Sequence, residues 1–237
     1  MKHFFFVFLV CAKLSVAQYT HGVGYYRIIF DSDKEIEQSA YKQQLDEIEK
    51  QAKKLKFELI FDQTTSFFGL VKDLKTDKED FASKMAMTIF GADKAYSTNW
   101  KEGYFVESTS FLGQDFLIKK NIADLDWELS KEKRIISGNV CYKAIGSRGV
   151  MDNNFEIQSF DIVAWYCPEI PFNYGPFEAV GLPGLVFELE IKGYSLVLEN
   201  LIWDKKPEKQ KMLKGKVISQ KEYDSIFKKM VKVRMPD

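Results

Sequence analysis

The chain has 237 residues, of which 46% are hydrophobic and 29% are charged, with 34 basic and 34 acidic side chains. This length suits one large α+β domain or two small ones, and because no Pro/Gly/Ser-rich linker or internal repeat divides the sequence we predict one domain. Because the formal net charge is zero, the chain lacks the basic excess needed to bind the phosphate backbone of a nucleic acid, and we expect no nucleic-acid partner.

The first residues have the features of a secretory signal peptide. Lys2 precedes an apolar run over residues 4–12, and the small residues Ser15 and Ala17 fit a signal-peptidase site. We therefore predict that residues 1–17 are removed and that the protein is exported, either to the periplasm or outside the cell.

The predicted mature chain is a single domain over residues 18–237. A lipoprotein acylated at Cys11 is the alternative, although Val10 stands where such a site has Gly, Ala or Ser. The mature sequence has no apolar run of the roughly 18 residues that a membrane-spanning helix needs, so we expect no transmembrane segment.

Three capping boxes, each a Ser or Thr followed three residues later by Glu, indicate the starts of helices. They are Ser32 with Glu35, Thr76 with Glu79, and Ser219 with Glu222. After the first box, apolar residues recur at helical spacing and predict an amphipathic helix over residues 33–55. The second box predicts a helix that ends before Gly91, and the third a helix near the C-terminus.

Most of the remaining sequence alternates between apolar and polar residues, the pattern of half-buried β-strands. We predict strands at residues 24–30, 56–61, 66–72, 104–111, 115–120, 127–136, 140–146 and 160–167, and a hairpin over 185–203. The hairpin is expected to turn at Lys192–Gly193. Short connections favour antiparallel neighbours, so the predicted fold class is α+β: a large, curved antiparallel β-sheet, open or half-barrel-like, with a few helices packed against it.

Cys141 and Cys167 are the two cysteines of the predicted mature chain, which would reach an oxidising compartment. They lie in consecutive predicted strands whose connection falls near residue 154, midway between them. Antiparallel pairing would therefore place them opposite each other. We predict a disulfide between them. Two buried free thiols are the alternative, because such a bridge requires a narrow Cα separation.

The sequence offers few residues for catalysis or metal binding. His21 is the only histidine of the predicted mature chain, which argues against a histidine-based triad or a multi-histidine zinc site. The fingerprints of metal, dinucleotide and nucleotide-phosphate sites are missing as well. We expect no metal and no cofactor, while a carboxylate-based hydrolase stays open.

Residues 164–190, AWYCPEIPFNYGPFEAVGLPGLVFELE, contain four of the six prolines together with several glycines and aromatic residues. Proline fixes φ and glycine permits positive φ, so this composition predicts a preorganised loop between two strands. Gly181, Pro183, Gly184 and Leu185 are its expected structural residues. The run Leu182-Pro183-Gly184-Leu185 suits a type II turn with Gly184 in the left-handed position.

The same stretch resembles the signature of the GLPGLI family of exported bacterial proteins. The resemblance rests on an AWY-x-x-EIP segment, a Gly-Pro pair and GLPGL[IV] before a hairpin. The matching residues are Ala164, Trp165, Tyr166, Glu169, Ile170, Pro171, Gly175, Pro176, Gly181, Leu182, Pro183, Gly184 and Leu185. Cys167 departs from the family pattern, which has threonine or a similar residue there. The resemblance implies a protein of the gram-negative envelope with no established activity.

Three functions are compatible with these features. We favour a non-enzymatic binding or carrier module for a hydrophobic ligand, with the loop at the mouth of a concave sheet. An interaction module docking on an envelope protein, such as an outer-membrane complex, is the second, and a carboxylate-based hydrolase using Glu169 is the third. The candidate binding residues are Trp165, Tyr166, Glu169, Phe172, Tyr174 and Leu182. A purely architectural motif is the alternative, in which Leu182 is at least half buried.

Overall fold

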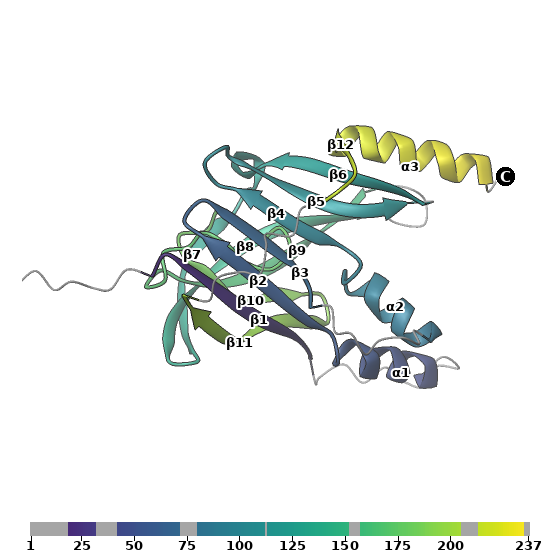
Figure 1. Ribbon diagram of the computed structural model, residues 1–237. Helices are drawn as coiled ribbons and strands as arrows, with labels where there is room; N and C mark the ends of the chain where they lie inside the picture. Colours follow the sequence, from purple (N-terminus) through teal and green to yellow (C-terminus); the bar gives the residue numbers. More distant parts are fainter. Residues whose placement is uncertain are drawn as a thin grey trace, which may run out of the picture.

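The computed structural model describes residues 19–31, 42–71, 80–111, 113–151, 157–204 and 213–234. Within these ranges, twelve strands form one sheet in the order β12-β6-β5-β4-β3-β2-β1-β11-β10-β9-β8-β7. The sheet curves strongly but does not close, and three α-helices pack against it (Figure 1). The predicted fold class is confirmed. The predicted cleavage site lies outside the described residues.

Short turns join several consecutive strands, whereas longer segments separate β1 from β2, β3 from β4, β9 from β10 and β11 from β12. The strands are β1 (His21–Phe30), β2 (Lys56–Asp62), β3 (Thr65–Leu70), β4 (Ala95–Asn99), β5 (Tyr104–Phe111), β6 (Gln114–Asn121), β7 (Glu128–Ile136), β8 (Asn139–Met151), β9 (Ile157–Cys167), β10 (Leu185–Ile191), β11 (Tyr194–Trp203) and β12 (Lys216–Ser219). The helices are α1 (Lys42–Ala52), α2 (Phe81–Ile89), α3 (Gln220–Arg234) and the short 3-10 helix η1 (Ile122–Asp124). All neighbouring strands pair antiparallel except β12, which is parallel to β6.

The strand predictions hold for most of the sheet. β5 has the predicted bounds, and the β10–β11 hairpin turns at Lys192–Gly193 as expected. β4 and β12 were not predicted. Both are short, and β4 consists of the polar run AYSTN, so neither has enough alternation to stand out. They are strands because longer neighbours supply backbone partners for them.

The helix predictions hold in part. The third capping box forms as predicted: Ser219 N donates to Glu222 Oε2 at 2.8 Å, and Glu222 N donates to Ser219 Oγ at 3.2 Å. α2 begins later than predicted, because Asp80 is its N-cap and accepts a hydrogen bond from Ser83 N at 2.8 Å. The residues of the other two boxes lie outside the described ranges. α1 ends inside the helix predicted over residues 33–55.

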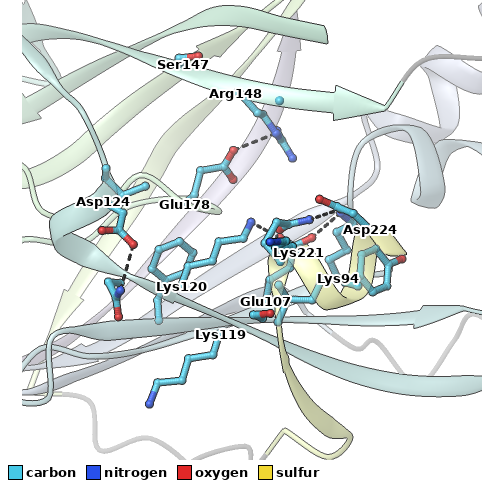
Figure 2. A pocket seen from close by; sticks show the side chains of 18 of the residues that line it. Lys94, Glu107, Lys119, Lys120, Asp124, Ser147, Arg148, Glu178, Lys221 and Asp224 are labelled. Atoms are coloured by element: carbon cyan, nitrogen blue, oxygen red, sulfur yellow. Dashed lines mark hydrogen bonds and ion pairs between the residues drawn. The ribbon is translucent and has the colours of Figure 1, made fainter. Parts of the chain in front are cut away.

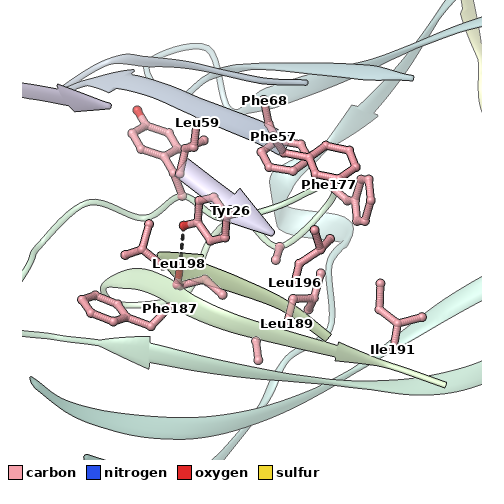
Figure 3. Packing of buried hydrophobic residues seen from close by; sticks show 14 of the residues in the cluster. Tyr26, Phe57, Leu59, Phe68, Phe177, Phe187, Leu189, Ile191, Leu196 and Leu198 are labelled. Atoms are coloured by element: carbon pink, nitrogen blue, oxygen red, sulfur yellow. Dashed lines mark hydrogen bonds between the residues drawn. The ribbon is translucent and has the colours of Figure 1, made fainter. Parts of the chain in front are cut away.

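The loop over residues 168–184 packs against the sheet through buried aromatic side chains. The ring of Phe177 lies 6.0 Å from that of Phe57 on β2, 5.3 Å from Phe68 on β3 and 5.6 Å from Tyr96 on β4. Figure 3 shows Phe177 beside Phe57 and Phe68, within the main cluster of buried side chains. The loop is therefore packed against strands in the middle of the sheet.

Hydrogen bonds fasten the loop and the strand after it to distant elements. Tyr26 of β1 donates its hydroxyl to the Val186 carbonyl at 2.6 Å, and Trp127 donates its indole N–H to the Val180 carbonyl at 3.1 Å. Leu182 is 1% exposed, as the architectural interpretation expects. The motif therefore belongs to the core of the protein.

The predicted type II turn is wrong. Gly184 N donates to Leu182 O at 2.8 Å, which closes a tighter turn around Pro183, and Leu185 N donates to Ile170 O instead of Leu182 O. Gly184 has a φ of 155°, and a Cβ there would lie 2.2 Å from the Cys167 carbonyl oxygen. Glycine is required at this position because the backbone of β9 passes directly beside it.

The two cysteines lie side by side in the β8–β9 ladder. This ladder pairs Tyr142 with Tyr166, so the next pair in the same register is Cys141 with Cys167. Both are buried free thiols in the structure, and they are hydrogen-bonded to each other. The predicted antiparallel placement is confirmed, and the disulfide itself stays a prediction.

Candidate functional site

A pocket of about 690 Å³ opens where the first half of the loop meets the end of β11. Five of its ten lining residues are aromatic, and we call it the aromatic pocket. It is lined by Tyr19, Gln63, Trp100, Glu169, Ile170, Pro171, Phe172, Asn173, Tyr174 and Trp203. Its walls thus come from the N-terminal segment, two inter-strand turns, the loop and the end of β11.

The loop side of the aromatic pocket is rigidly built. Tyr174 N donates to Phe172 O at 2.9 Å, and Val186 N donates to Tyr174 O at 3.0 Å, which fixes this stretch against β10. The Phe172 ring lies 4.7 Å from that of Phe61 on β2 and 5.9 Å from that of Trp203. Phe172 and Tyr174 are therefore buried behind the surface of the pocket and determine its shape.

The outer walls present accessible aromatic faces. Tyr19 stacks on Trp203 with ring centroids 4.4 Å apart and an angle of 10° between the planes. Trp100 follows β4, where its backbone N–H donates to the Thr64 carbonyl at 2.8 Å. The side chains of Tyr19 and Trp100 are 46% and 38% exposed, so large apolar surface is available at the rim.

Polar groups in the pocket are few. The Tyr174 hydroxyl is buried and has no hydrogen-bond partner among the described residues. Burial, reinforced by the negative charge of Asp62, raises the pKa of Tyr174, so the hydroxyl keeps its proton. Asn173 donates its side-chain amide to the Leu182 carbonyl at 2.6 Å. Glu169 is the one charged residue that lines the pocket.

The structure divides the predicted binding residues into two groups. Glu169, Phe172 and Tyr174 line the aromatic pocket, where residues of a loop at the mouth of a binding site are expected. Trp165, Tyr166 and Leu182 do not line it, and their exposed fractions are only 4%, 5% and 1%.

Trp165 has a structural environment of its own on β9. Its indole N–H donates to Glu190 at 2.7 Å, and the guanidinium of Arg134 lies 4.0 Å from the ring centroid. Arg134 also pairs with Glu188. This arrangement joins β7, β9 and β10, so Trp165 contributes to the sheet away from the pocket.

Three aromatic residues of the pocket are not among the binding residues predicted from the sequence: Tyr19, Trp100 and Trp203. They are distant from the motif in sequence, and the fold brings them to it because β11 and β2 both pair with β1. The sequence gives one signal, Trp203 at the end of the predicted hairpin, and this position alone does not show which residues Trp203 contacts.

The described residues show no metal-binding constellation of three or more His, Cys, Asp or Glu side chains. Among the helices in the same ranges, none has the length and apolar character needed to cross a membrane.

Comparison with known proteins gives a family of unknown function and a shared fold. The family described as "Protein of unknown function (Porph_ging)" matches residues 151–188, which contain β9, the loop and the first residues of β10. The match supports the resemblance seen in the motif at the level of a family of unknown function, and it does not carry the name GLPGLI. No curated protein matches the chain significantly.

Two solved structures of PNGF-II, in the C2 and P21 space groups, are similar to this chain. Each has a TM-score of 0.54 at 15% sequence identity, and each similarity covers 89% of this chain. The chain spans about a third of the PNGF-II chain, 33% in one structure and 34% in the other. At this identity the similarity shows the fold alone.

Proposed function

We propose that this protein is an exported, non-enzymatic binding module and that the aromatic pocket holds a hydrophobic ligand. The observation that carries the proposal is the pocket itself: five aromatic side chains surround about 690 Å³, and no basic residue lines it. Ligand sites in proteins typically have this size and this combination of apolar walls with few polar groups.

The walls indicate the chemistry of the ligand. Exposed faces of Tyr19 and Trp100 favour a flat apolar or aromatic surface that can stack on them. The Tyr174 hydroxyl needs a partner, because a buried unpaired polar group is costly, and an acceptor on the ligand would satisfy it. With Glu169 as the one charged lining group, the ligand is neutral or cationic.

Export is a second part of the proposal. It is supported by Lys2, the apolar run over residues 4–12 and the small residues before Gln18. The predicted mature chain has a single histidine, His21, and this fits a binding protein better than a histidine-based enzyme.

The other two functions receive less support. Docking through Trp165, Tyr166, Phe172 and Leu182 requires accessible side chains, whereas these four are between 1% and 7% exposed. A carboxylate-based hydrolase needs a second carboxyl group about 5 to 10 Å from Glu169. The lining of the aromatic pocket includes no other Asp or Glu.

A titration with N-phenyl-1-naphthylamine, a neutral apolar probe whose fluorescence rises in apolar surroundings, tests the pocket. We expect saturable binding to the wild-type protein. Trp100→Ala removes one accessible wall, and we expect the Kd for the probe to rise about five- to tenfold, the effect of losing one aromatic contact of about 1 to 1.4 kcal/mol.

Phe81→Ala is the matched control. Phe81 is 73% exposed at the start of α2, and it does not line the aromatic pocket. Its loss is expected to leave the Kd unchanged. Absence of saturable binding to the wild type, or an equal effect of both substitutions, would remove the support for the aromatic pocket as the site.

A further inference from the structure

A second cavity, of about 770 Å³, lies between β5, β6, β8 and the start of α3. It shares no lining residue with the aromatic pocket. Nine charged residues line it, five basic and four acidic, and Figure 2 shows their side chains around the central space. We call it the charged cavity.

One wall of the charged cavity holds a carboxylate between two lysines. Glu107 lies on β5 two residues after the fully buried Phe105, so its side chain projects from the same, inner face of the sheet. Lys94 Nζ lies 2.5 Å from Glu107 Oε1, and Lys120 Nζ lies 2.9 Å from Oε2. In the described part of the chain, Glu107 is the one carboxylate with which either lysine forms an ion pair.

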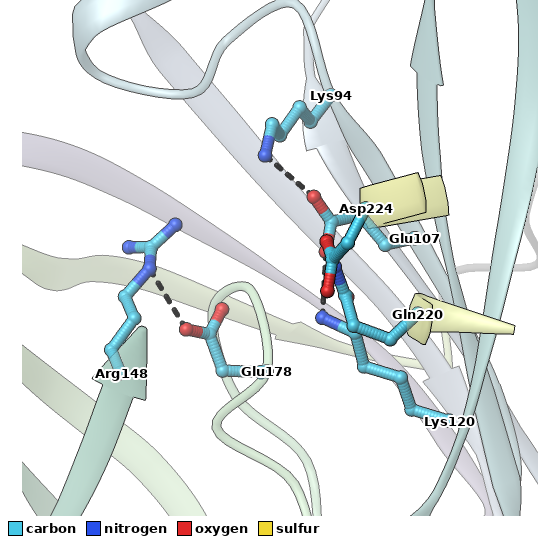
Figure 4. Close-up of polar contacts among 7 residues, drawn as sticks. All are labelled: Lys94, Glu107, Lys120, Arg148, Glu178, Gln220 and Asp224. Carbon is cyan, nitrogen blue, oxygen red and sulfur yellow. Dashed lines mark hydrogen bonds and ion pairs between the residues drawn. The ribbon is translucent and has the colours of Figure 1, made fainter. Parts of the chain in front are cut away.

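The opposite wall holds Arg148 of β8 and Glu178 of the loop. Arg148 Nε lies 2.9 Å from Glu178 Oε1, and the side chains are only 17% and 15% exposed. The guanidinium also lies 5.1 Å from the centroid of the Phe177 ring, so packing holds it in place. Figure 4 shows this pair facing the lysine pair across the cavity.

Lys94, Lys120 and Arg148 have more N–H donors than their ion pairs with Glu107 and Glu178 occupy. Each ammonium group has three N–H donors and the guanidinium has five. The side chains of Lys94 and Lys120 are 32% and 29% exposed, so both ammonium groups stay accessible while they pair with Glu107. In addition, α3 begins at the cavity with Gln220, and the N-terminal end of a helix is favourable for negative charge.

We propose that the charged cavity binds an anionic group, a phosphate or a carboxylate, between the lysine pair and Arg148. The anion accepts hydrogen bonds from Lys94 and Lys120 on one side and from the guanidinium of Arg148 on the other. Its charge compensates the excess of basic over acidic side chains in the lining. This site is independent of the aromatic pocket, so each can fail without the other.

The test uses inorganic phosphate and acetate as probes, titrated separately into the ¹⁵N-labelled full chain and followed by backbone amide shifts. We expect saturable shifts concentrated near residues 94, 107, 120 and 148. Tighter binding of phosphate would assign a phosphate ligand, and tighter binding of acetate a carboxylate ligand.

Lys120→Met leaves Lys94 paired with Glu107 and is expected to raise the Kd of the better probe at least tenfold. Lys192→Met removes an equal charge from the exposed β10–β11 turn and is expected to leave the Kd unchanged. If Lys120→Met does not fold, Lys94→Met makes the same test. Wild-type shifts that do not saturate or are scattered over the surface, or equal Kd values for Lys120→Met and Lys192→Met, would overturn the proposal.

Discussion

Gly184 occupies a position where two backbone segments pass too close for any side chain. A Cβ would lie 2.2 Å from the Cys167 carbonyl oxygen, whereas a Cβ at Gly193 would meet nothing within 4 Å. Both glycines have positive φ, 155° and 92°. Comparing substitutions at Gly184 and Gly193 therefore distinguishes the cost of a steric clash from the cost of a positive φ.

For Gly184→Ala we expect a loss of about 2 to 4 kcal/mol in the free energy of unfolding, because β9 or the loop must shift. Gly193→Ala changes only the backbone preference and should cost about 1 kcal/mol. Urea unfolding of both variants measures the difference. Equal losses would mean that the backbone approach at Gly184 is easily relieved.

Substitution of Leu182 distinguishes a structural role of the motif from a role in ligand binding. Its side chain is 1% exposed in the core around the loop, so Leu182→Ala should lower the free energy of unfolding by about 2 to 5 kcal/mol. The Kd for the naphthylamine probe should change little in the folded variant. A wild-type urea midpoint for Leu182→Ala would contradict the core placement of the motif.

Glu107 makes the stability depend on pH. Burial raises the pKa of Glu107, but Lys94 and Lys120 outweigh this effect and lower the pKa to about 2. Because the folded-state pKa lies below the ordinary value of 4.5, ionised Glu107 stabilises the fold above about pH 5. This contribution is lost as the pH falls towards 2.

Urea unfolding of wild type and Glu107→Gln at pH 7 and pH 3 tests this effect. The stability gap between them should narrow by about 2 kcal/mol at the lower pH. Glu132→Gln is the control, because it removes only an exposed partner of Lys143 and should cost less than about 1 kcal/mol at either pH. A gap that stays constant for Glu107→Gln would show that the lysines do not hold this carboxylate in its ionised form.

At the scale of elements, the sequence predicts a strand wherever one face is buried along its whole length. In β2, for example, Phe57, Leu59 and Phe61 alternate with more exposed residues, and this pattern is visible in the sequence. β4 and β12 lack it, because pairing with their neighbours makes them strands. The tight turn at Pro183 is not visible in the sequence either, because the Leu185 N–H donates to the Ile170 carbonyl, which is distant in sequence.

The two sites were predictable to different degrees. The loop half of the aromatic pocket was found through its composition, while Trp100 and Trp203 depend on the strand order, which local patterns do not contain. The charged cavity had a weaker signal: Glu107 stands at an inner-face position of an otherwise apolar alternation. The cavity also needs the Arg148–Glu178 pair, which comes from β8 and the loop, and only the curvature of the sheet brings this pair opposite Glu107.

The pairing of β8 with β9 supports the predicted disulfide between Cys141 and Cys167. Directly opposed residues in antiparallel strands have Cα atoms about 4.5 to 5.5 Å apart, within the range that a disulfide needs. Burial raises the pKa of the Cys141 thiol to about 12, so the free thiol would react slowly with alkylating reagents. Oxidation in an exported protein is therefore expected to pair the two cysteines with each other.

Peptide mapping of unreduced protein from its own host should recover Cys141 joined to Cys167. Reduction of the bridge should lower the free energy of unfolding by about 2 to 4 kcal/mol on the loop-entropy account. An alkylated thiol at either position in denatured, unreduced protein would contradict the prediction.

At the scale of the whole molecule, a single open sheet curves around one loop. Two cavities remain, one beside each half of this loop. Residues 169–174 line the aromatic pocket, and Glu178 lines the charged cavity. The stiffness of the Pro- and Gly-rich motif has a role in this arrangement, because one rigid segment shapes part of both sites. The similarity to PNGF-II covers 89% of the chain, so it includes most of the sheet.

Native mass spectrometry of the protein purified from its own host tests the central claim, that the aromatic pocket holds a ligand. We predict a non-covalent small-molecule adduct on the wild-type protein and on Phe81→Ala, and a clearly smaller adduct fraction on Trp100→Ala produced in the same way. An adduct-free wild type, or an adduct that persists undiminished in Trp100→Ala, would contradict the account.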